Sequence, residues 1–304
     1  MESRQQITAH TKPVSVNSLN DEVLNNEALN AESTNTEAST HHVTQKKQPY
    51  LSRQPDNHGH IHYSDDENAM WQALLERQAQ QIPNRACSAY LEGLDKLKLS
   101  PTHIPQLQDI DEVLQATTGW QTAAVPALIS FGKFFKLLAD KRFPVATFIR
   151  RFDDMDYIEE PDIFHEIVGH CPLLTHPAFA TFNETYGKLG LNATKQERLY
   201  LARLYWFTIE FGLVGATEEN RKIYGGGILS SPSETVYALS DEPDCRAFDL
   251  IDVLRTPYRI DQIQPIYYAI DDLDTLFDIV NSDIMGAVKK AMGLGLFAPT
   301  YAKK

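Results

Sequence analysis

The feature that most constrains the fold is a segment that is apolar on almost every side of a helix, from Leu204 to Leu213. Just before it, Thr194-Lys195-Gln196-Glu197 has the pattern of a capping box, which predicts a helix from this point through about Val214. A helix that is apolar all round has to be covered by other elements on all its sides. The sequence therefore predicts a buried central helix.

The remaining patterns are mostly those of further helices. Ser64-Asp65-Asp66-Glu67 is a second capping box, and Ser231-Pro232-Ser233-Glu234 combines a capping box with proline at the first helical position. A last amphipathic helix is expected between about residues 273 and 288, whereas residues 143–149 predict a short strand that ends at Arg150. We therefore expect a mainly α (α+β) fold, with mostly helices and a few short strands in one domain.

The first part of the chain has a different composition. Residues 1–49 contain no Phe, Tyr or Trp and are rich in Asn, Thr, Ser, Glu and Gln. Such a segment buries too little apolar area to offset the entropy lost on ordering. We expect a disordered polar tail over residues 1–60 and a folded domain over residues 61–304.

Charge and cysteine content limit the classes of partner and the cellular compartment. The formal net charge of −13 argues against nucleic acid or an anionic membrane as a partner. There is no apolar run near 18 residues and no signal-peptide core. Three cysteines, at no metal-site spacing, are typical of a reducing compartment. We expect a cytoplasmic protein that acts on a small molecule or binds a protein.

One ionisable residue interrupts the apolar segment. Glu210 lies among large apolar side chains, and an unpaired buried carboxylate costs several kcal/mol. A buried partner is therefore required. An arginine would form an ion pair with Glu210, whereas a metal ion would make it a ligand.

A second segment, Phe164-His165-Glu166-Ile167-Val168-Gly169-His170, is close to the His-Glu-x-x-His signature of zinc proteases. Its histidines are five residues apart, and a regular helix would turn their rings roughly 140° away from each other. Gly169 and Pro172 both weaken a helix, so His170 is expected in a distorted end turn. With Glu210, the two histidines would then form a 2-His-1-carboxylate triad suited to non-haem Fe(II). A zinc hydrolase with Glu166 as base, and purely structural histidines, are the alternatives.

Four ordered blocks of sequence resemble the pterin-dependent aromatic amino acid hydroxylases, particularly bacterial members, over about residues 65–275. These blocks are residues 161–170, Tyr205-Trp206-Phe207-Thr208-Ile209-Glu210-Phe211-Gly212-Leu213, Tyr224-Gly225-Gly226-Gly227-Ile228-Leu229-Ser230-Ser231 and Gln264-Pro265-Ile266-Tyr267-Tyr268. The resemblance implies the catalytic domain of that family.

The resemblance also implies the cofactors and their residues. His165, His170 and Glu210 would bind Fe(II), and a tetrahydropterin (tetrahydrobiopterin or a bacterial equivalent) would bind beside it, with O2 as co-substrate. Phe134 would be the aromatic platform for the pterin, although without the resemblance it would be taken for a core residue. The pterin residues implied in this way are Leu128, Ile129, Phe134, Glu166, Ala202 and Tyr205.

A substrate site follows from the same resemblance. Arg150 would bind the amino acid's carboxylate through two parallel hydrogen bonds. Spacing alone would instead suggest a surface arginine paired with Asp153 or Asp154. The glycine triplet at residues 225–227 would otherwise be read as a flexible turn. The remaining implied substrate residues are Tyr157, Pro161, Trp206, Phe211, Gly227 and Ser230.

The implied activity is hydroxylation of L-phenylalanine to L-tyrosine, the first step of phenylalanine catabolism. Ile260 stands where tyrosine hydroxylases of the family carry Asp, which favours phenylalanine over tyrosine as substrate. A tryptophan hydroxylase is the alternative within the family. The long oligomerisation helix of the family's animal enzymes is not expected in this sequence, so we expect a monomer or a small homo-oligomer.

Overall fold

Helices provide most of the regular structure in this computed structural model, which describes residues 50–126, 129–156, 158 and 160–300. The α-helices are α2 (Asp65–Gln81), α3 (Ser88–Leu97), α4 (Leu107–Thr117), α5 (Phe131–Ala139), α6 (Cys171–Leu174), α7 (Pro177–Asn192), α8 (Lys195–Tyr205), α9 (Gly226–Leu229), α10 (Pro232–Tyr237), α11 (Leu250–Arg255), α12 (Thr275–Asn281) and α13 (Ile284–Leu294). The π-helical segments are η2 (His165–His170) and η3 (Trp206–Glu210), and the 3-10 turns are η1 (Phe152–Asp154) and η4 (Glu218–Asn220).

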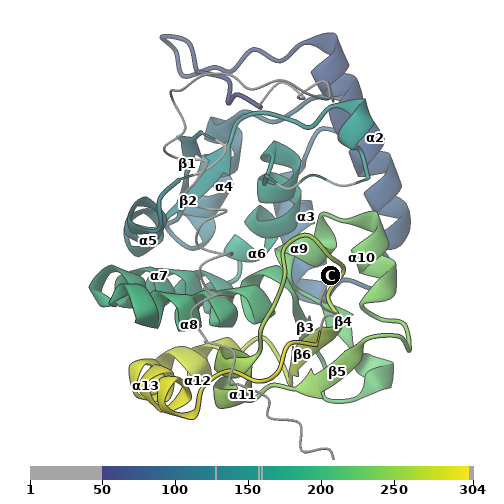
Figure 1. Ribbon diagram of the computed structural model, residues 1–304. Helices are drawn as coiled ribbons and strands as arrows, with labels where there is room; N and C mark the ends of the chain where they lie inside the picture. Colours follow the sequence, from purple (N-terminus) through teal and green to yellow (C-terminus); the bar gives the residue numbers. More distant parts are fainter. Residues whose placement is uncertain (1–49, 127–128, 157, 159, 301–304) are drawn as a thin grey trace, which may run out of the picture. The chain divides into compact units, whose positions relative to one another are not determined.

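The strands form two small sheets (Figure 1). In the first, β1 (Gln121–Val125) and β2 (Arg142–Ala146) pair in parallel and are connected through α5. The second has the order β4-β3-β6-β5, made of β3 (Gly212–Val214), β4 (Lys222–Ile223), β5 (Asp244–Ala247) and β6 (Ile266–Ile270). In this sheet only β3 and β4 pair antiparallel. The expectation of a mainly α fold with a few short strands is confirmed.

The central helix begins as expected and ends earlier. Thr194 and Glu197 form the complete capping box at the start of α8, and α8 contacts α7, α11 and α13. The helix ends at Glu210 instead of continuing to Val214, because the chain turns at Phe211 and then enters strand β3. A side chain at Gly212 would collide with the Tyr224 ring, so the turn depends on this glycine. The predicted helical end was therefore wrong.

Two other helical expectations need correction. The single helix expected over residues 273–288 is two helices, α12 and α13, because the Asp283 carboxylate accepts the Gly286 N–H (2.8 Å) and caps a new helix. At α10, Ser231 caps the helix as expected, but the Glu234 carboxylate does not complete the capping box. It accepts hydrogen bonds from the Gln264 N–H (3.1 Å) and from the Tyr267 hydroxyl instead.

The segment before α2 packs on the domain. Residues 50–60, which were expected in the tail, include Ser52, whose hydroxyl donates to the Val125 carbonyl (2.7 Å), and Arg53, which pairs with Glu67 (2.9 Å). The Thr147 N–H donates to the Ser52 hydroxyl (3.1 Å), so residue 147 bonds to this segment instead of extending β2. The rest of the expected tail lies outside the described residues.

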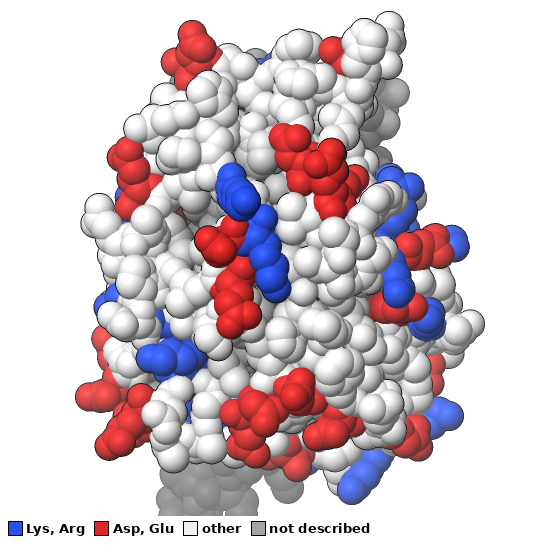
Figure 2. Space-filling model, turned by 180° about the vertical axis from the view of Figure 1, so that it is seen from behind, with Lys and Arg blue, Asp and Glu red and all other residues white. Residues whose placement is uncertain are grey.

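Charged side chains of both signs are interspersed on one face of the molecule. On the face drawn in Figure 2, Lys and Arg side chains lie mostly beside Asp and Glu, without a broad basic patch. None of the helices within the described ranges combines the length and the apolar character needed to cross a membrane.

Helices α3 and α6 meet at a glycine, which gives a test of the packing. A Cβ built at Gly93 would lie 2.0 Å from the Pro172 carbonyl oxygen. We expect Gly93→Ala to lower the free energy of unfolding by about 1–3 kcal/mol, because backbone has to move to relieve the overlap. Urea denaturation measures the change.

The matched control is Gly132→Ala, at an exposed helical position with nothing within 4 Å of the added Cβ. This variant should be as stable as the parent or gain up to about 1 kcal/mol. Equal destabilisation by both substitutions would contradict the inferred contact between α3 and α6.

Candidate active site

The two histidines of the sequence motif share a face because the segment between them is π-helical. Backbone hydrogen bonds in a π-helix join residue i to residue i+5, and the Cys171 N–H accordingly donates to the Glu166 carbonyl. Residues five apart therefore lie above one another. The Nε2 atoms of His165 and His170 are 3.0 Å apart. The expected distortion is present, and it extends over the whole of η2 and not only its end turn.

Glu210 reaches the histidines from a second π-helical segment. The Phe211 N–H donates to the Trp206 carbonyl (2.8 Å), which closes η3 with the same i to i+5 bond. The Glu210 Oε2 lies 3.3 Å from His170 Nε2 and 3.7 Å from His165 Nε2. Adjacent ligand atoms on an octahedral ion with bonds near 2.1 Å are about 3 Å apart. The three side chains therefore fit one metal ion.

Three partly exposed residues of the central helix form a stripe along one of its sides. Every residue between 201 and 210 is buried except Ala202, Trp206 and Glu210. These residues follow one another at intervals of four, so they lie on the same side of the helix. The stripe joins one residue expected at the pterin, one expected at the substrate and one expected at the metal.

The protonation states suit metal binding. Burial, followed by the neighbouring His170, lowers the pKa of His165 to about 4, so this imidazole is neutral at pH 7. Burial raises the pKa of Glu210, but attraction to His170, a hydrogen bond from it and attraction to His165 outweigh burial and leave the pKa below its usual value. A neutral imidazole and an ionised carboxylate are the forms that bind a metal ion.

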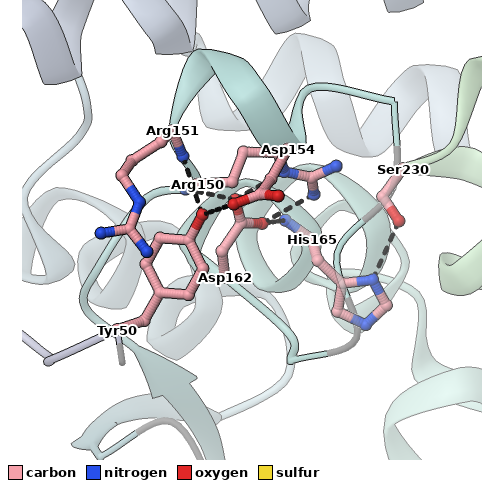
Figure 3. A network of polar contacts seen from close by, with 7 residues as sticks. All are labelled: Tyr50, Arg150, Arg151, Asp154, Asp162, His165 and Ser230. Carbon is pink, nitrogen blue, oxygen red and sulfur yellow. Dashed lines mark hydrogen bonds and ion pairs between the residues drawn. The ribbon is translucent and has the colours of Figure 1, made fainter. Parts of the chain in front are cut away.

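Ser230 contacts one of the two histidines that could bind a metal ion. Its hydroxyl lies 2.9 Å from His165 Nδ1, and such a partner fixes the ring so that Nε2 remains for a metal (Figure 3). His170 is held differently, since its Nδ1 is buried and has no hydrogen-bond partner among the described residues. A Cβ at Gly226 would lie 2.3 Å from the His170 ring, so close packing of α9 fixes that ring.

The glycine triplet is packed and does not form an open loop. A Cβ at Gly225 would lie 2.4 Å from the Glu210 carbonyl oxygen, and one at Gly227 would lie 3.0 Å from the Phe211 ring. The start of α9 therefore lies directly on both π-helical segments. This arrangement explains why three glycines occur here, and it excludes the reading as a flexible turn.

Arg150 is buried against Asp162 and is not a surface residue. The two side chains are 6% and 0% exposed, and Nε and Nη2 of Arg150 donate to the two carboxylate oxygens at 2.8 and 2.9 Å. Asp162 also accepts the backbone N–H of Arg150 (3.0 Å) and of His165 (3.0 Å). The carboxylate thus accepts four hydrogen bonds, about its full capacity. Asp162 is not among the site residues expected from the sequence.

Burial raises the pKa of Asp162, but its contacts with Arg150 outweigh burial and lower the pKa below its usual range. Asp162 is therefore ionised, and it connects the arginine to the first histidine (Figure 3). No local sequence signal identifies this pair, because Arg150 follows a strand whereas Asp162 precedes a helix.

Tyr50 holds the chain that follows Arg150. Its hydroxyl donates to the Asp154 carboxylate and accepts the Arg151 N–H (3.1 Å), as drawn in Figure 3. Its ring stacks on Phe148 with centroids 4.8 Å apart, and the Arg151 guanidinium lies 4.3 Å from the ring centroid. Sequence reasoning missed Tyr50 because it falls within the expected tail.

Phe134 and Phe135 differ in how deeply their rings are buried. Phe135 is fully buried, whereas Phe134 is partly exposed and meets Tyr205 edge to face with centroids 5.4 Å apart. Phe134 is therefore not the core residue that its sequence context alone suggested.

Glu166 is buried, and burial together with repulsion from Glu210 and Asp162 raises its pKa well above the usual value.

Trp206 lies in an aromatic cluster. Its ring stacks on Tyr258 (4.3 Å between centroids) and lies 4.5 Å from Phe211, while its Nε1 donates to Gln264 (3.1 Å). Among the other expected site residues, Ile129 and Pro161 are partly exposed. Leu128 and Tyr157 lie outside the described residues.

The chain is similar to known proteins over most of its length. Residues 31–289 match the family model described as biopterin-dependent aromatic amino acid hydroxylase. A phenylalanine-4-hydroxylase of Pseudomonas aeruginosa is 58% identical over 259 residues, which cover 85% of this chain and 98% of that protein. One from Vibrio cholerae is 55% identical, covering 84% of this chain and 88% of that protein.

The chain is also similar to solved structures. The apo structure of the cold-active phenylalanine hydroxylase from Colwellia psychrerythraea 34H has a TM-score of 0.81 at 55% identity, covering 83% of this chain and 97% of that one. A Chromobacterium violaceum phenylalanine hydroxylase structure with bound oxidised Fe(III) has a TM-score of 0.74 at 42% identity, covering 77% and 86%.

The metal centre can be tested by removing its carboxylate. We expect Glu210→Ala to lose iron on desalting, because two imidazoles remain where three ligands converged. Glu219→Ala, at an exposed position, is the control and should keep about one iron per chain. Elemental analysis of the desalted proteins measures iron, and full iron retention by Glu210→Ala would exclude the triad.

Proposed function

The chain belongs to the family of biopterin-dependent aromatic amino acid hydroxylases, and we propose on this basis that it hydroxylates L-phenylalanine to L-tyrosine with Fe(II), a tetrahydropterin and O2. The observation that carries the proposal is the convergence of two imidazoles and one carboxylate from two π-helical segments. When bound, iron and tetrahydropterin together activate O2 for attack on the aromatic ring.

We assign the metal to His165, His170 and Glu210. Three protein ligands on one side of an octahedral ion leave three positions for other ligands. The zinc-hydrolase alternative would use Glu166 as a base that accepts a proton from water, but its raised pKa favours the protonated, neutral carboxyl. A protonated carboxyl in that position is suited to donate a hydrogen bond to a pterin.

The substrate carboxylate is assigned to Arg150. A guanidinium has five N–H groups, and the bonds to Asp162 use those of Nε and one of Nη2. No hydrogen bond to a described residue uses Nη1. The end of the guanidinium, formed by Nη1 and Nη2, therefore remains for two parallel hydrogen bonds to a carboxylate, while Asp162 fixes the plane of the group.

Aromatic side chains supply the other contacts. We assign Trp206, Phe211 and Pro161 to the substrate side, where the ring of phenylalanine needs an apolar slot. Phe134 is assigned to the pterin, supported by its partly exposed ring. Ser230 is expected to act chiefly through His165, which it contacts directly.

A cytoplasmic location and a monomer or small homo-oligomer complete the proposal. The location is supported by three free cysteines, two of them buried, which is usual in a reducing compartment. Light scattering of the purified protein measures the oligomeric state.

The activity test is tyrosine formation by the purified chain with Fe(II), a tetrahydropterin, O2 and L-phenylalanine. We expect tyrosine only when iron and pterin are both present, and none when zinc replaces iron. L-Tryptophan offered alone should be turned over more slowly. Faster turnover of tryptophan would reassign the substrate within the family.

Arg150→Lys tests the carboxylate contact. Lysine keeps the charge that Asp162 needs but loses the two-pronged geometry, so about 1.5–3 kcal/mol of binding is lost. We expect KM for phenylalanine to rise about 10- to 100-fold, with a smaller change in kcat. Arg151→Lys, at the adjacent exposed position, is the control and should leave KM nearly unchanged. An unchanged KM in Arg150→Lys would refute the assignment.

A further inference from the structure

A second group of metal-binding side chains lies at the surface, in the loop Asp56-Asn57-His58-Gly59-His60-Ile61-His62. One ligand atom from each of Asp56, His60 and His62 lies within 4.8 Å of the others, and all three residues are exposed. The Asp56 Oδ2 is 3.1 Å from His62 Nε2, and the two imidazole rings have centroids 4.8 Å apart. None of these residues belongs to the catalytic site.

The loop presents the carboxylate in a fixed orientation. The Gly59 N–H donates to the Asp56 carbonyl (2.9 Å) and the Asp56 N–H to the His60 carbonyl (2.9 Å), which closes a turn. Asp56 Oδ1 accepts the backbone N–H groups of His58 (2.8 Å) and His60 (3.0 Å). The backbone therefore occupies one carboxylate oxygen and turns the other toward His62. Gly59 permits this turn, since its φ is +80°.

The two histidines are aligned by the residue between them. Ile61 is buried, and both of its backbone groups bond to the Gln106 side chain, at 2.8 Å for its N–H and 3.0 Å for its carbonyl. His60 and His62 flank it and are both exposed. With Ile61 directed inward, its neighbours lie on the same outer side of the segment. Folding of the domain thus brings the imidazoles together before any ion binds.

We propose that Asp56, His60 and His62 form a second metal site, which binds a divalent transition-metal ion of the Zn²⁺ type. Two imidazoles and a carboxylate are ligands that zinc accepts, with water completing the shell. The separation of 3.1 Å between Oδ2 and Nε2 is close to the roughly 3.4 Å between two ligands of a tetrahedral ion with bonds near 2.1 Å. Mg²⁺ and Ca²⁺ prefer all-oxygen ligands, so they fit less well.

The charge state agrees with this assignment. Hydrogen bonds from the backbone of His60 and His58, and from His62, lower the pKa of Asp56. The carboxylate is therefore ionised at neutral pH. The exposed position leaves room for water ligands. Bound metal would join Asp56 to His60 and His62 in the folded loop, and so stabilise the folded chain.

His58 provides a matched control. It lies in the same turn and is exposed, but it is not part of the group of three. The test compares the parent chain with His62→Ala and with His58→Ala, all loaded with iron, because an occupied catalytic site keeps the two metals apart. Each protein is equilibrated with ZnCl2 under anaerobic conditions and desalted, and zinc and iron are measured by elemental analysis.

We expect one zinc and one iron per chain for the parent and for His58→Ala. His62→Ala should keep its iron and bind zinc about 100-fold more weakly or not at all. Zinc should raise the Tm of the first two proteins and leave that of His62→Ala unchanged. No zinc on the iron-loaded parent, zinc that only replaces iron, or equal zinc binding by His62→Ala would each overturn the proposal.

Discussion

The i to i+5 backbone hydrogen bond is the constraint on which the proposed metal centre depends. In a regular α-helix, the five-residue interval between His165 and His170 would direct the rings apart. The wider π-helical turn in η2 brings the two histidine rings onto one face. A second wider turn, in η3, places Glu210 opposite the two rings. Single π-helical turns are rare, but those that do occur are frequently found at functional sites. Here they form part of the ligand geometry itself.

The second organising feature is a saturated buried carboxylate. Burying Asp162 and Arg150 would be costly if any of their charged groups lacked a partner. The four hydrogen bonds to Asp162 meet that requirement and at the same time fix a guanidinium and the first turn of the metal-binding segment. The proposed substrate-binding group and a proposed metal ligand therefore share one support. Displacing Asp162 would disturb both.

Local sequence patterns predicted structure that forms within a few residues. Contacts between residues far apart in the sequence were not predicted. The capping boxes at Ser64 and Thr194 are formed within a few residues, so they could be read from the sequence. The proposed metal ligands followed from residue chemistry combined with a family resemblance. The contact of Tyr50 with Asp154 spans 104 positions, and the link between Arg150 and Asp162 depends on a loop, so no periodicity reveals either. The π-helical turns were predicted only as an unspecified distortion.

The glycine triplet limits how the proposed active site can change by substitution. Where α9 meets the proposed metal ligands, backbone lies against the His170 ring and the Glu210 carbonyl with no side chain between them. A side chain added at Gly225 or Gly226 would overlap these groups, so this part of the site accepts only glycine unless backbone moves. By contrast, the cluster of Trp206, Phe211 and Tyr258 consists of side chains whose volume substitution can change. Changes in selectivity are therefore expected in that cluster and not in the triplet.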